Sequence, residues 1–195
     1  MAIAMAALTL QAADANYHVV PLPQSITAEK GAAFTLDANT AVFAVGADEA
    51  MQRNAAFLKQ YIREATGIEA AGVDKKGAAI TLKLNAKIAG EEGYVITVKA
   101  KGVTIEGKTP QGVFYGIQTL RKSLPVEKAQ RVSLPAARIV DQPRFGYRGA
   151  MLDCARHYFN LDFVKEFVDM LALHNLNVFH WHLTDGGGWR MEVKK

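Results

Sequence analysis

The sequence has a single cysteine, Cys154, among 195 residues, so an internal disulfide is excluded and a buried free thiol is expected. Runs of basic residues interleaved with aromatic residues are missing, and the net charge of +4 is spread along the chain. We therefore expect no nucleic-acid partner. The sequence also lacks an apolar stretch long enough to predict a membrane span, and it shows no internal repeats or heptads.

Half of the residues are apolar, which is typical of a globular chain, and the length allows one or two domains. The first 15 residues, MAIAMAALTLQAADA, are small and apolar and end in an A-x-A pattern. This segment resembles the tail of a secretory signal peptide without the basic start, and it predicts an exported protein, periplasmic or secreted. A short N-terminal helix is the alternative.

Short strands alternate with two helices between residues 16 and 142. The first helix is expected to begin after Asp48 and to end at Gly67; the second begins at Thr109-Pro110, where a hydroxyl cap precedes a first-turn proline. Period-two alternation predicts strands at 34–36, 41–45, 79–84, 94–99, 103–106 and 137–140, the fourth and fifth forming a hairpin. An antiparallel sheet with helices on one face fits this order, and no side-chain constellation in the region suggests catalysis.

Residues 147–194 read as strand, helix, strand, which at this length indicates a parallel β-α-β unit. Asn160 is a helix cap, and apolar residues at helical spacing follow it as far as Leu171. Asn175 ends the helix, because asparagine tolerates the left-handed turn.

Alternation places the side chains of the second strand on two faces. Phe179, Trp181 and Leu183 share the face expected under a helix, and Val178, His180 and His182 share the other. Asp153 ends the first strand, and Asp185 follows the second. Polar groups therefore gather at the carboxyl ends of parallel strands, where α/β folds bind ligands.

Two blocks, RGAMLDCARHYF and LNVFHWHLTDGGGWRMEVK, resemble the opening of the catalytic barrel of glycoside hydrolase family 20, the β-N-acetylhexosaminidases. The preceding region is similar to that family's small N-terminal domain in element order. The resemblance implies an α/β protein with a mostly antiparallel α+β accessory domain at 16–142 and the first β-α-β of a TIM (β/α)8 barrel at 143–195. A complete barrel takes roughly 250 residues, so the barrel is truncated here.

The resemblance also implies roles for two residues. Arg156, in the LDxxRH block, matches the arginine that binds the 3- and 4-hydroxyls of the sugar. Asp185, the catalytic candidate, matches the aspartate that orients a histidine behind the general acid. His182 is a substrate-binding candidate because alternation points it inward, below Asp185. Each has a structural alternative: an ion pair of Arg156 with Asp153, a loop cap by Asp185, and a core histidine. His157 and His180 are interpreted as structural.

The implied reaction is hydrolysis of terminal β-linked N-acetylglucosamine or N-acetylgalactosamine on a glycan substrate, by a substrate-assisted retaining mechanism. An Asp-Glu pair on a later strand performs it in the family, and no residue here matches that pair. The chain itself is therefore expected to be inactive, and no cofactor is expected. Many family members read TDDQGW where this sequence has TDGGGW, which removes a carboxylate and an amide from the loop.

Two other functions stay open. Residues 17–142 could form a non-catalytic carbohydrate-binding or docking module. His180-x-His182 beside Asp153 and Asp185 has the composition of the metal site of a barrel amidohydrolase. Because two strand edges lack neighbours, we expect residues 143–195 to be disordered, to self-associate through those edges, or to pack on the first domain.

Overall fold

The computed structural model describes residues 13–46, 48–71 and 79–194. The chain divides into two compact units, Met1–Gln142 (unit 1) and Pro143–Lys195 (unit 2). The predicted signal-peptide remnant at residues 1–15 falls mostly outside the described residues. None of the helices described is long and apolar enough to cross a membrane.

The main sheet of unit 1 has six strands. Their order is β2 (Ser25–Ala28), β9 (Ala137–Asp141), β6 (Tyr94–Lys99), β7 (Gly102–Gly107), β5 (Ala79–Leu84) and β4 (Ala41–Ala44). The pairs β2–β9, β9–β6 and β6–β7 are antiparallel, which confirms the predicted hairpin and the mostly antiparallel sheet. The pairs β5–β4 and β7–β5 are parallel. Helix α1 connects β4 to β5, whereas between β5 and β7 the chain passes through β6, which pairs on the other side of β7.

A second, smaller sheet was not predicted. It joins β1 (Ala13–Asp14), β8 (Val132–Leu134) and β3 (Phe34–Leu36). Within it, β1 runs parallel to β8 and β3 runs antiparallel to β8. Phe34 and Leu36 are fully buried, so this sheet continues the core of unit 1.

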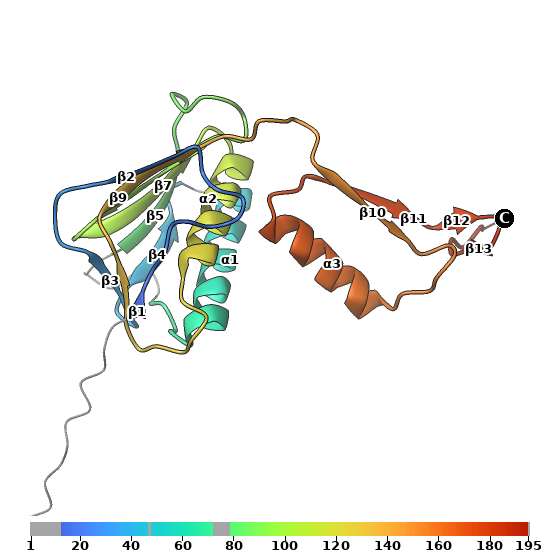
Figure 1. The fold of residues 1–195 in the computed structure, drawn as a ribbon, viewed down its shortest axis with the longest axis horizontal. Helices are drawn as coiled ribbons and strands as arrows, with labels where there is room; N and C mark the ends of the chain where they lie inside the picture. Colours follow the sequence, from blue (N-terminus) through green and yellow to red (C-terminus); the bar gives the residue numbers. More distant parts are fainter. Residues whose placement is uncertain (1–12, 47, 72–78, 195) are drawn as a thin grey trace, which may run out of the picture. The chain divides into compact units, whose positions relative to one another are not determined.

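Helices α1 (Glu49–Thr66) and α2 (Pro110–Ser123) lie side by side on one face of the main sheet (Figure 1). The caps are the predicted ones. Asp48 Oδ1 accepts the N–H of Met51 at 2.9 Å, and Thr109 Oγ1 accepts the N–H of Gly112 at 3.2 Å. Gly67 ends α1 with φ 82°. The fully buried residues between helices and sheet include Leu58, Ile62, Ile80, Ile96, Ile105, Ile117 and Leu120.

Unit 2 is the predicted β-α-β unit. It consists of β10 (Gly149–Asp153), α3 (Leu161–Leu173), β11 (Val178–His182) and a small hairpin of β12 (Thr184–Asp185) and β13 (Gly188–Trp189). Strands β10 and β11 pair in parallel, with Asp153 opposite His182. Asn160 Oδ1 accepts the N–H of Phe163 at 2.9 Å, and Asn175 has φ 58°, as the sequence predicts for the two ends of α3.

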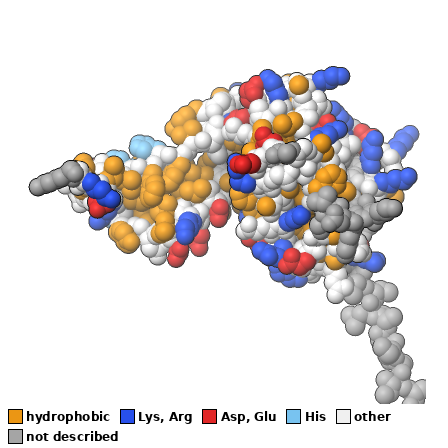
Figure 2. Space-filling view, turned by 180° about the vertical axis from the view of Figure 1, so that it is seen from behind, with side chains coloured by type: hydrophobic (Ala, Val, Ile, Leu, Met, Phe, Trp, Pro, Cys, Tyr) orange, Lys and Arg blue, Asp and Glu red, His pale blue; other side chains and the backbone are white. Residues whose placement is uncertain are grey.

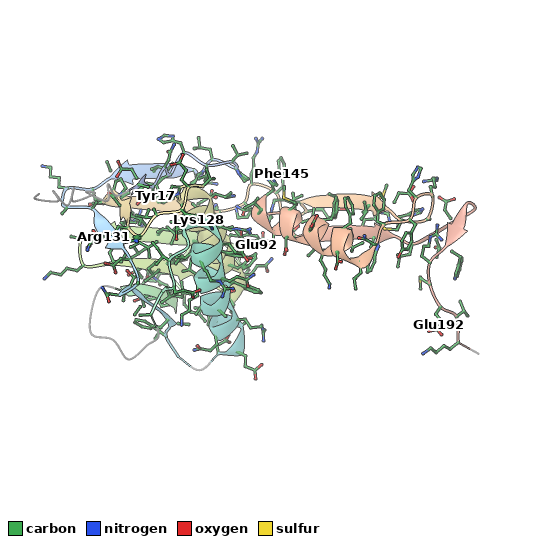
Figure 3. All side chains as sticks on the ribbon, turned by 90° about the horizontal axis from the view of Figure 1, so that it is seen from below. Tyr17, Glu92, Lys128, Arg131, Phe145 and Glu192 are labelled. Atoms are coloured by element: carbon green, nitrogen blue, oxygen red, sulfur yellow. The ribbon has the colours of Figure 1, made fainter. Side chains whose placement is uncertain are left out.

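One face of the β10–β11 pair packs against α3 (Figure 3). The small core contains Leu152, Cys154 and Val164, with Phe159, Phe167, Phe179 and Leu183 against it. Trp181 Nε1 donates to Cys154 Sγ at 3.2 Å, and the thiol is buried as predicted. The opposite face is open: Met151 is 52% exposed. Hydrophobic side chains cover much of the visible surface of unit 2 in Figure 2.

Candidate functional site

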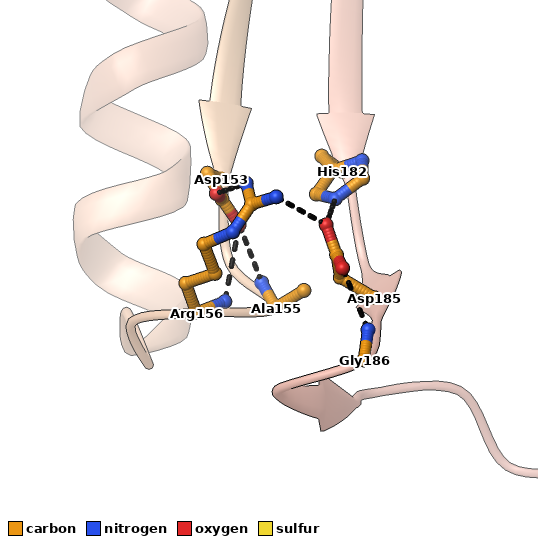
Figure 4. Close-up of polar contacts among 6 residues, drawn as sticks. All are labelled: Asp153, Ala155, Arg156, His182, Asp185 and Gly186. Carbon is orange, nitrogen blue, oxygen red and sulfur yellow. Dashed lines mark hydrogen bonds and ion pairs between the residues drawn. The ribbon is translucent and has the colours of Figure 1, made fainter.

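Asp153 lies at the carboxyl end of β10 and holds the loop that follows it. Its Oδ1 accepts the backbone N–H groups of Ala155 and Arg156, each at 3.1 Å. Its Oδ2 lies 2.5 Å from one terminal nitrogen of the Arg156 guanidinium. One carboxylate therefore fixes both the backbone and the side chain of Arg156 (Figure 4).

Asp185 reaches the same guanidinium from β12, the short strand that follows β11. Its Oδ2 lies 2.6 Å from the other terminal nitrogen of Arg156 and 3.0 Å from His182 Nε2. Its Oδ1 accepts the backbone N–H of Gly186 at 2.6 Å. The guanidinium is thus shared between one carboxylate at the end of β10 and one in β12, and its remaining N–H groups can serve a ligand (Figure 4).

Hydrogen bonds hold the pKa of both carboxyls below the ordinary aspartate value. For the pKa of Asp153 the largest cause is the backbone N–H of Arg156, followed by its guanidinium. For the pKa of Asp185 the largest cause is the hydrogen bond from His182, followed by the Gly186 N–H and the charge of Arg156. The bond to Asp153 is also the largest cause of the raised pKa of Arg156. All three groups therefore carry their charges around neutral pH.

The Gly-rich hairpin packs directly on the loop after β10. A Cβ at Gly188 would lie 2.3 Å from the carbonyl oxygen of Ala155, so only glycine fits there. Arg190 Nε donates to the carbonyl of Cys154 at 3.1 Å. By contrast, a Cβ at Gly186 or Gly187 would meet no described atom within 4 Å, and neither residue has a positive φ.

The structure brings all three predicted site residues together. Arg156 and Asp185 meet at the rim of the two strands, and His182 faces Asp185. The structural alternatives occur at the same time, since Arg156 pairs with Asp153 and Asp185 caps Gly186. The sequence offers Asp153 only as an ion-pair partner for Arg156, and no pattern in it predicts the two hydrogen bonds that Asp153 accepts from the loop.

The other histidines of the segment take no part in this cluster. His180 lies on the open face, its ring centroid 5.8 Å from that of His182. In the part of the chain that the structure describes, no three His, Cys, Asp or Glu side chains are grouped to hold a metal ion. The arrangement therefore offers cationic and carboxylate hydrogen-bonding groups to a polar ligand, rather than a ligand set for a metal.

Both units match known protein families. Residues 16–142 match glycosyl hydrolase family 20, domain 2, and residues 145–195 match the glycosyl hydrolase family 20 catalytic domain. The chain belongs to glycoside hydrolase family 20. The β-α-β of unit 2 is accordingly the start of the family's barrel, and neither the module nor the metal-hydrolase alternative is favoured.

Relatives from bacteria extend the comparison. A β-hexosaminidase of Porphyromonas gingivalis is 36% identical over 192 residues, covering 93% of this chain and 24% of the relative. The N,N'-diacetylchitobiase of Vibrio harveyi is 28% identical, covering 92% of this chain and 20% of the relative. The family 20 chain therefore spans about a quarter or less of the length of these relatives.

Solved family 20 structures share the fold. The N-acetyl-β-hexosaminidase of Streptomyces plicatus, in complex with Thio-NAglucal, aligns with a TM-score of 0.78 and 32% identity, over 87% of this chain and 35% of that one. The exo-β-N-acetylglucosaminidase of Vibrio harveyi, in complex with N-acetylglucosamine, aligns with a TM-score of 0.78 and 29% identity, over 94% and 28%.

Proposed function

We propose that the chain is the N-terminal portion of an exported β-N-acetylhexosaminidase. The whole protein hydrolyses terminal β-linked N-acetylglucosamine or N-acetylgalactosamine by the substrate-assisted retaining route. The observation that carries the proposal is the Arg156 guanidinium, held between Asp153 and Asp185 with N–H groups to spare. The names of the relatives, β-hexosaminidase and β-N-acetylhexosaminidase, support the substrate class.

The proposed roles follow from the chemistry of each group. The guanidinium donates to two neighbouring hydroxyls of the sugar ring, for which a planar fork of donors is well suited. Asp185 is an ionised acceptor that orients an imidazole. The imidazole that Asp185 contacts here is that of His182, to which we assign a role in substrate binding. We place the accessory domain at 16–142 and the start of the barrel at 143–195.

The chain of 195 residues contains no match to the Asp-Glu pair that the reaction requires. We therefore expect it to give no turnover of a chromogenic N-acetylglucosaminide above a heat-killed control, and clear turnover above that control would contradict the proposal. The protein expressed from its gene at full length is expected to be active. There, Arg156→Ala should lower kcat/KM about a hundredfold, since hydrogen bonds from a charged donor are lost.

Arg53→Ala is the matched control for this experiment. Arg53 is an exposed arginine on α1 that pairs with Glu49 across one helical turn, and its removal should leave kcat/KM unchanged. Equal losses in both variants would show that Arg156 acts through general stability. An unchanged kcat/KM in Arg156→Ala alone would remove Arg156 from the sugar site.

Export remains part of the proposal and rests on residues 1–15. Cleavage after Ala15, where the A-x-A pattern ends, would leave Asn16 as the mature N-terminus in a periplasmic or secreted fraction. It would also remove β1, whose residues Ala13 and Asp14 pair with Val132 and Ser133 of β8. A protein that stays in the cytoplasmic fraction with residues 1–15 attached would contradict it.

We also propose that the 195-residue chain self-associates through the unpaired edges of β10 and β11. Within the described strands each pairs with one neighbour, and the face opposite α3 is open. Sedimentation velocity should show a concentration-dependent dimer. Met151→Lys, on the open face, should weaken it, whereas Met170→Lys, on the exposed side of α3, should not. A monomer at all concentrations would refute this proposal.

A further inference from the structure

A pocket of about 300 Å³ opens on unit 1, near the ends of β6 and β9. Its floor includes Val95 and Val140, which are opposite each other in register. Both alternate with core residues, Ile96 and Ile139, so they lie on the sheet face away from α1 and α2. The volume is at the lower end of ligand pockets, which suits a ligand of one sugar ring.

Two cations line this pocket, Lys87 from the loop after β5 and Arg138 from β9. Both residues are exposed. Within the ranges 13–46, 48–71 and 79–194, neither side chain forms a hydrogen bond or an ion pair. Their charges are therefore available to an anionic group.

Asp141, the one carboxylate among the described residues that line the pocket, is already engaged. Its Oδ1 accepts the backbone N–H of Gln24 at 3.2 Å, and its Oδ2 accepts the hydroxyl of Tyr94 at 3.1 Å. Lys122 also interacts electrostatically with Asp141. Burial lowers the pKa of Lys122, and the charge of Asp141 raises it by a smaller amount. The carboxylate of Asp141 is thus occupied by Gln24 and Tyr94. With Lys87 and Arg138 beside it, the pocket keeps a net positive charge.

The walls are fixed by hydrogen bonds before any ligand arrives. Gln24 Nε2 donates to the carbonyl of Gln142 at 2.9 Å, which ties the segment before β2 to the end of β9. Asn85 holds the other wall: its Oδ1 accepts the N–H of Lys87 at 3.0 Å, and its Nδ2 donates to Glu106 at 2.9 Å. A preformed pocket loses less conformational entropy on binding.

We propose that this pocket binds an anionic sugar, through Lys87 and Arg138 on a carboxylate or a sulfate ester, with the ring over Val95 and Val140. Charged donors form the stronger hydrogen bonds with such anions, and the apolar floor fits the carbon face of a pyranose. The proposal concerns unit 1 alone and does not depend on the reaction proposed for the barrel site. It adds an anion-binding pocket on unit 1 to a family 20 chain, which differs from the free-standing module that the comparisons do not favour.

The test is an NMR titration of the ¹⁵N-labelled 195-residue chain with four probes: glucuronate, N-acetylglucosamine 6-sulfate, neutral N-acetylglucosamine and inorganic sulfate. We expect saturable shifts at residues 24, 87–89 and 138–142 with one or both anionic sugars. Whichever binds more tightly identifies the anionic group. Equal binding of the neutral sugar, or of sulfate alone, at these residues would overturn the proposal, as would shifts confined to other residues.

The variant Lys87→Gln/Arg138→Gln should bind the anionic sugar at least about tenfold more weakly. The matched control, Lys99→Gln/Lys101→Gln, removes two exposed lysines of the same unit that do not line the pocket. Circular dichroism checks that both variants are folded, which is expected because all four side chains are at the surface. Equal weakening in both would show a general charge effect and refute the pocket.

Discussion

Gly188→Ala tests whether the contact between the hairpin and the loop after β10 sets the Arg156–Asp185 pair. The new Cβ would lie 2.3 Å from the carbonyl oxygen of Ala155, and it must withdraw by about 0.7 Å to reach even the shortest separations that real Cβ atoms show. The obstacle is backbone, so the hairpin itself must move. A shift of that size lengthens the 2.6 Å contact between Arg156 and Asp185 beyond good hydrogen-bond geometry.

The assay is the carboxyl titration of Asp185 by ¹³C NMR in the 195-residue chain. In Gly188→Ala, the pKa of Asp185 should rise part of the way toward the ordinary aspartate value, because the positive charge of Arg156 moves away, while the hydrogen bonds from His182 and Gly186, which are the larger causes of the lowering, stay within the local segment. Unit 2 should also lose about 1–3 kcal/mol of stability through overpacking.

The matched control is Gly187→Ala in the same hairpin. Its Cβ meets no described atom within 4 Å, so the pKa of Asp185 should stay low. The free energy of unfolding should rise by about 0.4–1 kcal/mol, because alanine restricts the unfolded chain. An unchanged pKa of Asp185 in a folded Gly188→Ala protein, or equal changes in both variants, would refute the reasoning.

Three further predictions concern stability. Gly116→Ala should destabilise unit 1, because the new Cβ would lie 2.6 Å from the buried side chain of Ile105. The higher helix propensity of alanine, about 1 kcal/mol, is expected to be too small to offset this clash. A variant that is more stable than the parent protein in urea unfolding would contradict the prediction. Asp48→Ala should lower the free energy of unfolding by about 1 kcal/mol, because it removes the cap of α1. Calorimetry measures this loss, and an unchanged stability would contradict the prediction. The lowered pKa values of Asp153 and Asp185 mean that their contribution to stability is present above the ordinary aspartate pKa and is lost as the pH falls through the lowered values. Thermal unfolding of unit 2 in acid checks this, and a transition independent of pH there would be inconsistent with it.

The helix ends were predictable because each depends on one local hydrogen bond. Asp48, Thr109 and Asn160 cap the three helices, and Gly67 and Asn175 adopt the left-handed backbone that such ends need. The two faces of β11 followed from alternation in the same way. In these cases the deciding information lies within a few residues of sequence.

Features that depend on distant partners were not predictable. Strand β2 is short and mostly exposed, and β8 has only three residues. They are recognisable only through the pairing of β2 with β9 and of β8 with β1 and β3. The parallel pairing of β5 with β4 and β7 leaves no mark on alternation, since both kinds of strand repeat every two residues.

The candidate site shows the same division. The resemblance predicted Arg156 and Asp185 at one rim, and the structure places them in contact. The role of Asp153 in fixing the loop through two backbone N–H groups depends on the local path of the chain, which the sequence does not encode in a recognisable pattern.

The two units differ greatly in the size of their cores. Unit 1 encloses a continuous cluster of buried residues between two helices and two sheets, whereas the cluster of unit 2 centres on Leu152, Cys154 and Val164. Heat should therefore melt residues 143–194 well before the first unit, in a separate and shallow transition. A single melting temperature would not describe this chain, and amide protons of β10 and β11 should exchange with solvent long before those of β6 and β7.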